Sequence, residues 1–282
     1  MAANPWIAAL TALFLWWFST GLILVAVRWA DKDKAFSNFF VASLPLLVLG
    51  ISGISLTTEL GGVTSTFLPN FPPESVAGIY ISFTSALLVW GWIEFGFLTG
   101  IVTGPNLSHC PRDIPGWERF IRAWGTIAYH EMLIAACLVG IGLATLGTTN
   151  EVAFWTFAVL FAARVSAKLN LFLGVSKINT EFLPTPLAHL PSHFRIARMN
   201  WLFPISVTAL TAAVVYWLMG LSGAATPAEA VGFALLAALT GLALVEHWLM
   251  VLPLPDEKLW RWMLPKKTDT TPKRRSEEAH GL

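Results

Sequence analysis

Seven ionisable side chains lie in stretches of this chain that are otherwise apolar enough to cross a lipid bilayer. They are Glu94, His130, Glu131, Arg164, Lys168, Glu246 and His247. An ionisable residue at the bilayer centre costs at least ~2.5–3.5 kcal/mol, so those that persist usually face protein or water and have partners. The carboxylates and the two cations can nearly neutralise one another if their segments pack together. We therefore expect Arg164 and Lys168 to be counter-ions inside a helical bundle, although Lys168 could instead snorkel to the interface.

Residue types alone leave three interpretations of this cluster open: a structural lock between helices, a site for a ligand or pigment, and a proton or ion path. Either His130 or His247 can offer a neutral imidazole nitrogen to the magnesium of a chlorin. Ala243, four residues before His247, leaves room there for a flat macrocycle. A di-metal centre is disfavoured, because the Glu-x-x-His spacing of di-iron bundles is missing.

The composition places these residues in a polytopic membrane protein. Of the 282 residues, 55% are hydrophobic and 12% are charged, and the mean hydropathy is +0.64, which is atypical of a soluble domain. A membrane-spanning helix takes about 20 apolar residues, and the stretches that qualify are 6–27, 39–58, 77–102, 120–146, 152–175, 201–221 and 228–252. We predict an all-α integral membrane protein with a single bundle of about seven transmembrane helices over residues 1–264 and a charged, mobile tail at 265–282.

The positions of Lys and Arg predict the orientation of the bundle. Arg164 and Lys168 apart, every basic residue falls in or at the edge of the connector after the first, third or fifth stretch, or beyond the last stretch. Because cytoplasmic loops carry an excess of basic residues, we expect a periplasmic N-terminus and a cytoplasmic C-terminus. Glu94, His130 and Glu131 then lie roughly 15 Å from the cytoplasmic ends of their helices. Arg164 is expected at a similar depth, near the midplane, and Lys168, Glu246 and His247 closer to the cytoplasm, so the acids and bases fall in one slab.

Three glycines at four-residue steps, Gly96, Gly100 and Gly104, end the third apolar stretch. Small residues at this spacing let two helix backbones approach closely, so we expect a helix-packing face there, with Glu94 beside it and directed into the bundle.

In the connectors, His109 with Cys110 and His189 with His193 are candidate soft metal ligands, but solvated loop residues are expected. No metal site is predicted. The Ser/His/Asp sets, zinc signatures and nucleotide fingerprints of soluble enzymes are missing from the sequence.

Five stretches of the sequence are distinctive: "LLVWGWIEFGFLTGIVTGP" (87–105), "WTFAVLFAARVSAKLNLFLGV" (155–175) and "EFLPTPLAHLPSHFRIARMNWLFPISVT" (181–208), with "FLWWFSTG" (14–21) and "YHEMLIA" (129–135). In their order and spacing they resemble a known family, the PuhE-type photosynthetic complex assembly proteins of purple phototrophic bacteria. The similarity runs over about residues 10 to 220. The characteristic polar positions of the family correspond to Glu94, His130, Glu131, Arg164, Lys168 and Asn170.

This resemblance implies a multi-pass protein of the bacterial cytoplasmic (inner) membrane, including the intracytoplasmic photosynthetic membrane. It would be a non-enzymatic assembly factor whose partners are reaction-centre and core light-harvesting antenna subunits and membrane lipids. Bacteriochlorophyll or a precursor is the implied ligand, with His130 or His247 as the magnesium ligand and Glu94 and Glu131 beside it. The basic tail suits anionic lipid and orientation rather than nucleic acid.

Two other functions compete with this one. The first is a membrane enzyme that acts on a tetrapyrrole or isoprenoid, with Glu131 and His130 as the acid–base pair; it needs a reachable substrate cavity. The second is a transporter or proton path through the buried carboxylates, which is disfavoured because the two halves of the chain show no internal symmetry.

Overall fold

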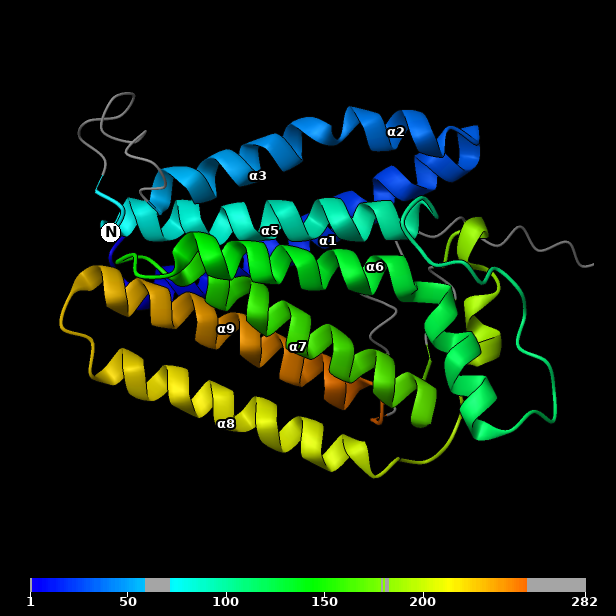
Figure 1. Cartoon of the computed structure of the whole chain (residues 1–282). Coiled ribbons are helices and arrows are strands. Elements are labelled where there is room, and N and C mark those ends of the chain that lie inside the picture. Colours follow the sequence, from blue (N-terminus) through cyan, green and yellow to red (C-terminus); the bar gives the residue numbers. More distant parts are fainter. Residues whose placement is uncertain (1, 59–71, 179, 181–182, 253–282) are drawn as a thin grey trace, which may run out of the picture.

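The computed structural model describes residues 2–58, 72–178, 180 and 183–252. Within these residues the chain is helical, and seven spans are long and apolar enough to cross a membrane. The helices are α1 (Pro5–Asp33), α2 (Phe36–Ala42), α3 (Leu44–Thr57), α5 (Val76–Leu98), α6 (Gly116–Thr145), α7 (Val152–Leu173), α8 (Leu202–Ser222) and α9 (Pro227–Leu249). Figure 1 shows them side by side and nearly parallel or antiparallel, except that the start of α6 runs across one end of the bundle. The prediction of a seven-helix bundle is confirmed. The expected tail at 265–282 lies outside the described residues.

The second span is built from two helices because a proline interrupts it. Pro45 stands in the first turn of α3, has no N–H to donate and would clash with the carbonyl one turn earlier. The helix therefore breaks at Ser43, whose hydroxyl donates to the carbonyl of Phe40 at 2.6 Å. α2 and α3 together still form one span, Phe36–Thr57.

Side-chain caps fix the starts of three other helices. Asn4 accepts a hydrogen bond from the amide of Trp6 at the start of α1, and Ser75 accepts one from Gly78 at the start of α5. At the start of α9, Thr226 accepts from Glu229 at 3.2 Å. Each cap satisfies an amide that has no partner within its helix, so the helix begins at a defined residue.

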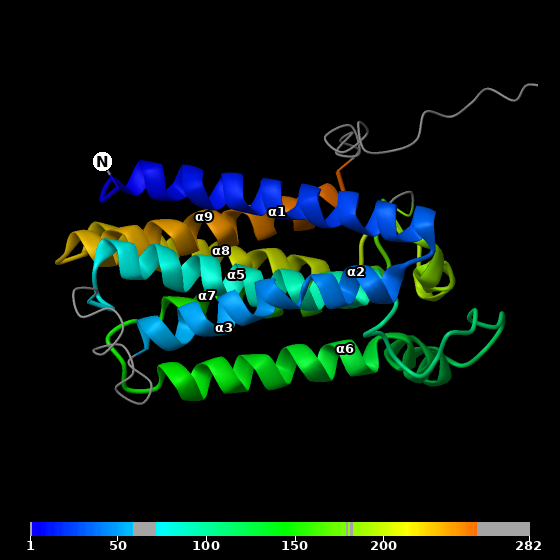
Figure 2. The same ribbon diagram turned by 90° about the horizontal axis from the view of Figure 1, so that it is seen from above.

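α5, α7 and α9 form the centre of the bundle, as the two perpendicular views show (Figures 1 and 2). α7 packs against α5, α6 and α9, while α1 covers α9 and α5, α3 covers α5, and α8 lies against α9. One apolar cluster joins α1, α5 and α9 around Phe83 and Leu235, and another joins α5, α6 and α7 around Ile93 and Phe157. Of the four helices that carry the charged side chains, α5 and α7 therefore each pack against the other three.

The outward faces of the bundle are apolar. The exposed large side chains include Leu10, Val48, Leu143 and Met219, which lie on α1, α3, α6 and α8. A water-soluble protein rarely exposes so many apolar side chains in contiguous patches, whereas lipid tails accept them without cost. Exposed apolar side chains on the periphery and charged side chains inside are the arrangement that a bilayer favours.

The prediction of one glycine face on the third span is wrong, because α5 ends at Leu98. Gly100 has a positive φ of 78°, and its amide bonds to the carbonyl of Phe97 while the amide of Ile101 bonds to that of Gly96. This is a Schellman ending, in which a left-handed glycine satisfies the last carbonyls of the helix. Gly96, Gly100 and Gly104 meet three different neighbours: the ring of Phe40, the ring of Pro186 and the backbone of α6.

Gly104 makes the closest of these approaches, and alanine at this position is expected to destabilise the protein by about 1–3 kcal/mol. A Cβ there would overlap the carbonyl oxygen of Gly125, which belongs to rigid helix backbone. The matched control is Gly140→Ala in α6, because a Cβ at Gly140 has no neighbour within 4 Å and alanine favours a helix. Thermal unfolding in detergent measures both variants, and equal unfolding temperatures would contradict the close packing at Gly104.

Candidate functional site

Two ion pairs connect α7 with α5 and α6 inside the bundle. Arg164 donates to Oε2 of Glu94 at 2.7 Å, and Lys168 donates to Oε1 of Glu131. Glu94 and Glu131 have side chains that are 11% and 7% exposed, so both carboxylates are withdrawn from solvent. We call these four residues the charged centre.

The four-residue spacing of Arg164 and Lys168 explains how α7 forms ion pairs with both α5 and α6. Residues four apart lie one turn apart on the same face of a helix. Arg164 and Lys168 therefore place their charges on one face of α7, one turn from each other. Lys168 also places its ammonium 5.2 Å from the ring centroid of Phe97 on α5, a favourable cation–π distance. Lys168 therefore reaches Glu131 and does not extend away from the bundle as a snorkelling lysine would.

A cavity of about 780 Å³ opens beside the charged centre. Its walls come from α1, α5, α6, α7 and α9 and from the connector after α7. The lining is mainly apolar and includes several aromatic side chains: Trp16, Trp90, Phe97, Phe120, Trp124 and Phe172. The volume lies in the range of ligand cavities, and an apolar wall with a few convergent polar groups is typical of sites for small organic molecules.

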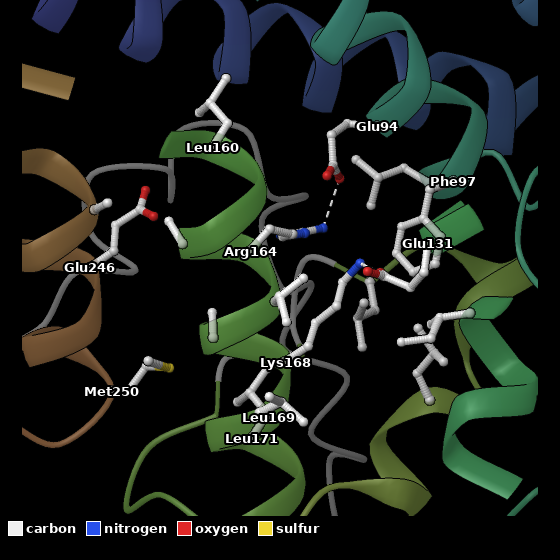
Figure 3. Close-up of a pocket in the computed structure, with 18 of the residues that line it drawn as sticks. Glu94, Phe97, Glu131, Leu160, Arg164, Lys168, Leu169, Leu171, Glu246 and Met250 are labelled. Atoms are coloured by element: carbon white, nitrogen blue, oxygen red, sulfur yellow. Dashed lines mark hydrogen bonds and ion pairs between the residues drawn. The ribbon is translucent and has the colours of Figure 1, made fainter. Parts of the chain in front are cut away.

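A third carboxylate, Glu246 on α9, lines the same cavity. Its side chain is exposed there. Figure 3 shows α7 between the acids: Glu94 and Glu131 lie on one side of its cations, and Glu246 projects from α9 on the other. Among the described residues, Glu246 has no hydrogen bond or ion pair, which distinguishes it from Glu94 and Glu131.

Neither candidate histidine lines the cavity. His247 is 1% exposed, its Nδ1 lies 2.8 Å from the carbonyl oxygen of Ala243, and its Nε2 lies 2.8 Å from the hydroxyl of Ser166. Both nitrogens are therefore occupied within the protein. Ala243 does line the cavity, but its carbonyl orients His247 and the imidazole lies behind it.

His130 is also enclosed. It is 0% exposed, and its ring packs 4.5 Å from that of Phe97. Its Nε2 lies 3.7 Å from Oε1 of Glu94, beyond hydrogen-bond distance, and neither ring nitrogen has a hydrogen-bond partner in the described chain. The imidazole is a buried neighbour of the charged centre that a ligand in the cavity does not meet.

We also expected Asn170, a polar position of the resembled family, in the buried charge cluster with Glu94, Glu131, Arg164, Lys168 and Glu246. This expectation is wrong, because Asn170 belongs to a different network from the charged centre. Its Nδ2 donates to the carbonyl of Ser166 at 2.9 Å and to the hydroxyl of Ser206 at 3.0 Å. Asn200 donates to Oδ1 of Asn170 at 3.0 Å and to the carbonyl of Gly174 at 2.8 Å. These contacts join the end of α7 to α8, on the side of α7 away from the ion pairs. Asn200 and Ser206 were not predicted from the sequence; the "MNWLFP" motif was their only signal.

The connector after α7 covers one end of the cavity, where Leu190, His193 and Phe194 line it. Arg119 on α6 donates to the carbonyl oxygens of Phe172 and His193, each at 2.8 Å. Its guanidinium also stacks 4.3 Å from the centroid of the Phe172 ring. One side chain thus joins α6, the end of α7 and the connector.

His189 and His193 are buried, at 5% and 2% exposure, so the expectation of solvated loop residues is wrong for these two, whereas His109 is exposed. Burial lowers the pKa of His189 below its ordinary value of 6.5, and the nearby His109 acts in the same direction. Burial likewise lowers the pKa of His193. Over the described ranges, no group of three or more His, Cys, Asp or Glu side chains is arranged to hold a metal ion.

Comparison with known proteins gives a family. A family model described as "Protein of unknown function (DUF3623)" matches residues 2–271. A Rhodobacter capsulatus protein, named "Uncharacterized 30.4 kDa protein in puhA 5'region", is 49% identical over 268 residues, which cover 94% of this chain and 93% of the relative. No solved structure matches the chain. The chain belongs to the DUF3623 family.

Proposed function

We propose that this member of the DUF3623 family is a non-enzymatic accessory factor for assembly of the photosynthetic reaction centre with its core light-harvesting antenna. Its site of action would be the bacterial cytoplasmic membrane and its intracytoplasmic photosynthetic extension. The relative from Rhodobacter capsulatus supports this role, because its name places it in the puhA 5' region, which suggests a link to photosynthesis operons. The seven apolar spans suit a protein that meets integral membrane subunits.

A pigment-binding role is the second part of the proposal. The observation that carries it is the cavity of about 780 Å³ between α1, α5, α6, α7 and α9. Aromatic and aliphatic walls suit the body of a bacteriochlorophyll or of a precursor, and the carboxylates and cations at its side suit the polar substituents of such a molecule. An accessory factor with this cavity would hold a pigment until a subunit receives it.

Catalysis by a Glu131–His130 pair has less support. A general acid or base must come within hydrogen-bond reach of the substrate or reach it through one water. His130 does not line the cavity, and Glu131 is bound by Lys168. The lining of the cavity therefore favours binding of a pigment over acid–base catalysis by Glu131 and His130.

A deletion strain tests the proposed role. We expect reaction-centre and core antenna complexes to fall while the pigments extracted from the cells keep their normal chemical identity. Wild-type levels of both complexes would contradict the assembly role. Accumulation of one discrete pigment intermediate would instead indicate an enzyme. Complementation with the Gly140→Ala chain, which changes only an open position on α6, is the matched control.

A further inference from the structure

We infer that Glu246 is the side chain that coordinates the magnesium of a chlorin-type pigment in the cavity. The inference rests on the proposed pigment-binding function and names the residue and the chemistry that would recognise the pigment. It replaces the expectation that a histidine has this role.

Glu246 is the carboxylate of the cavity wall that has no hydrogen bond or ion pair in the described part of the chain. Polar groups in the membrane interior usually pair with one another or meet water. Glu94 and Glu131 each accept a hydrogen bond from a cation on α7. Glu246 lines the cavity with an exposed side chain, and within the described ranges no side chain or backbone group bonds to it. A ligand in the cavity is the partner that this arrangement accommodates.

The other candidate ligands are excluded by their contacts. His247 uses both nitrogens within the protein, and His130 is enclosed behind Phe97. Glu94 and Glu131 would have to give up their ion pairs to coordinate a metal, which would leave Arg164 and Lys168 with unpaired charges. Glu246 loses no described interaction when it binds a ligand.

The chemistry of the donor also fits. Magnesium prefers hard oxygen ligands, and carboxylate oxygens are the ones that proteins supply most often. Glu246 would hold the metal of such a pigment through a carboxylate oxygen. Trp16, Trp90 and Leu239 line the cavity with Glu246 and provide apolar surface for the ring. Arg164 lines the same cavity, with its guanidinium bound to Glu94.

The test compares two pigments that differ only in the metal. Purified full-length protein in detergent is titrated with bacteriochlorophyll and with bacteriopheophytin, its magnesium-free form, and binding is followed by absorbance. We expect the magnesium pigment to bind at least about tenfold more tightly, since loss of even an outer-shell partner of a metal costs about 10–100-fold in affinity. Glu246→Ala should abolish this preference, and Glu246→His, which restores a ligand, should recover it.

Val245→Ala is the control variant, because Val245 is an exposed neighbour on the same helix that does not line the cavity. Thermal unfolding of each variant in the same detergent shows that it is folded. Equal affinity of the wild-type protein for the two pigments, or a preserved preference in folded Glu246→Ala, would overturn the role of Glu246 and leave pigment binding intact. Failure of the wild-type protein to bind either pigment would overturn pigment binding itself and this inference with it.

Discussion

Replacement of Lys168 with methionine is expected to destabilise the protein by on the order of 3–5 kcal/mol. Methionine keeps an unbranched apolar chain at this position but removes the charge. Glu131, whose side chain is 7% exposed, then keeps a buried charge without its partner. The contact of the ammonium with the ring of Phe97 is lost as well. Equilibrium unfolding in detergent measures the change.

A double variant separates two contributions to the free energy of unfolding: the cost of leaving Glu131 charged without a partner, and the net stabilisation by the Lys168–Glu131 ion pair. Lys168→Met combined with Glu131→Leu should recover most of the lost stability, because replacing both members of a buried pair by apolar groups is often neutral. Added salt should not restore the single variant, since buried charges are poorly screened. A single variant as stable as the wild-type protein would contradict the burial of Glu131 beside Lys168.

Arg164→Ala is expected to cost about 3 kcal/mol, the lower end of the same range. Glu94 loses its ion-pair partner at 2.7 Å, and its side chain is 11% exposed. The Arg164 side chain itself is 37% exposed toward the cavity, so water or a ligand there can take over part of its role. Thermal unfolding in detergent measures the loss.

The matched control for this pair is Arg164→Met with Glu94→Gln, which removes both charges and keeps their bulk. Its unfolding temperature should lie closer to the wild-type value than that of Arg164→Ala. A loss as large as that of the single variant would show that the two residues act independently and would contradict their pairing.

Sequence reasoning could find the charged side chains but not their partners. The high cost of ionisable groups in lipid singles out residues such as Glu94 and Arg164 without any coordinates. Which acid meets which cation depends on the rotation of α5 and α6 about their axes, and no local pattern fixes that rotation. The orientation of the bundle across the membrane stays a prediction.

The histidines show the same limit. Neighbouring residues on a helix point about 100° apart, so His130 and Glu131 point in different directions, and so do Glu246 and His247. The spacing does not say which member of each pair turns inward. In both pairs the structure places the glutamate at the cavity and the histidine behind it.

The known effects of glycine and proline on helices would have predicted two features of the fold. The four-residue spacing of glycines obscured the first of them. Gly100 at the end of an apolar stretch is a helix stop, and its Schellman bonds have a known pattern. Pro45 likewise marks the break between α2 and α3. Asn170 differs, because its partners Asn200 and Ser206 come from α8 and the segment before it, and only the tertiary fold brings them together.

The most direct test of a pigment cavity is the near-infrared absorption spectrum of the protein purified from pigment-producing cells. We expect bound pigment in the wild-type protein, and we expect Ala163→Phe to remove it because Ala163 lines the cavity. Ala162→Phe, at the adjacent and exposed position that does not line the cavity, should keep the absorbance. A colourless wild-type protein, or pigment retained at the wild-type level in folded Ala163→Phe, would contradict the assignment of this cavity.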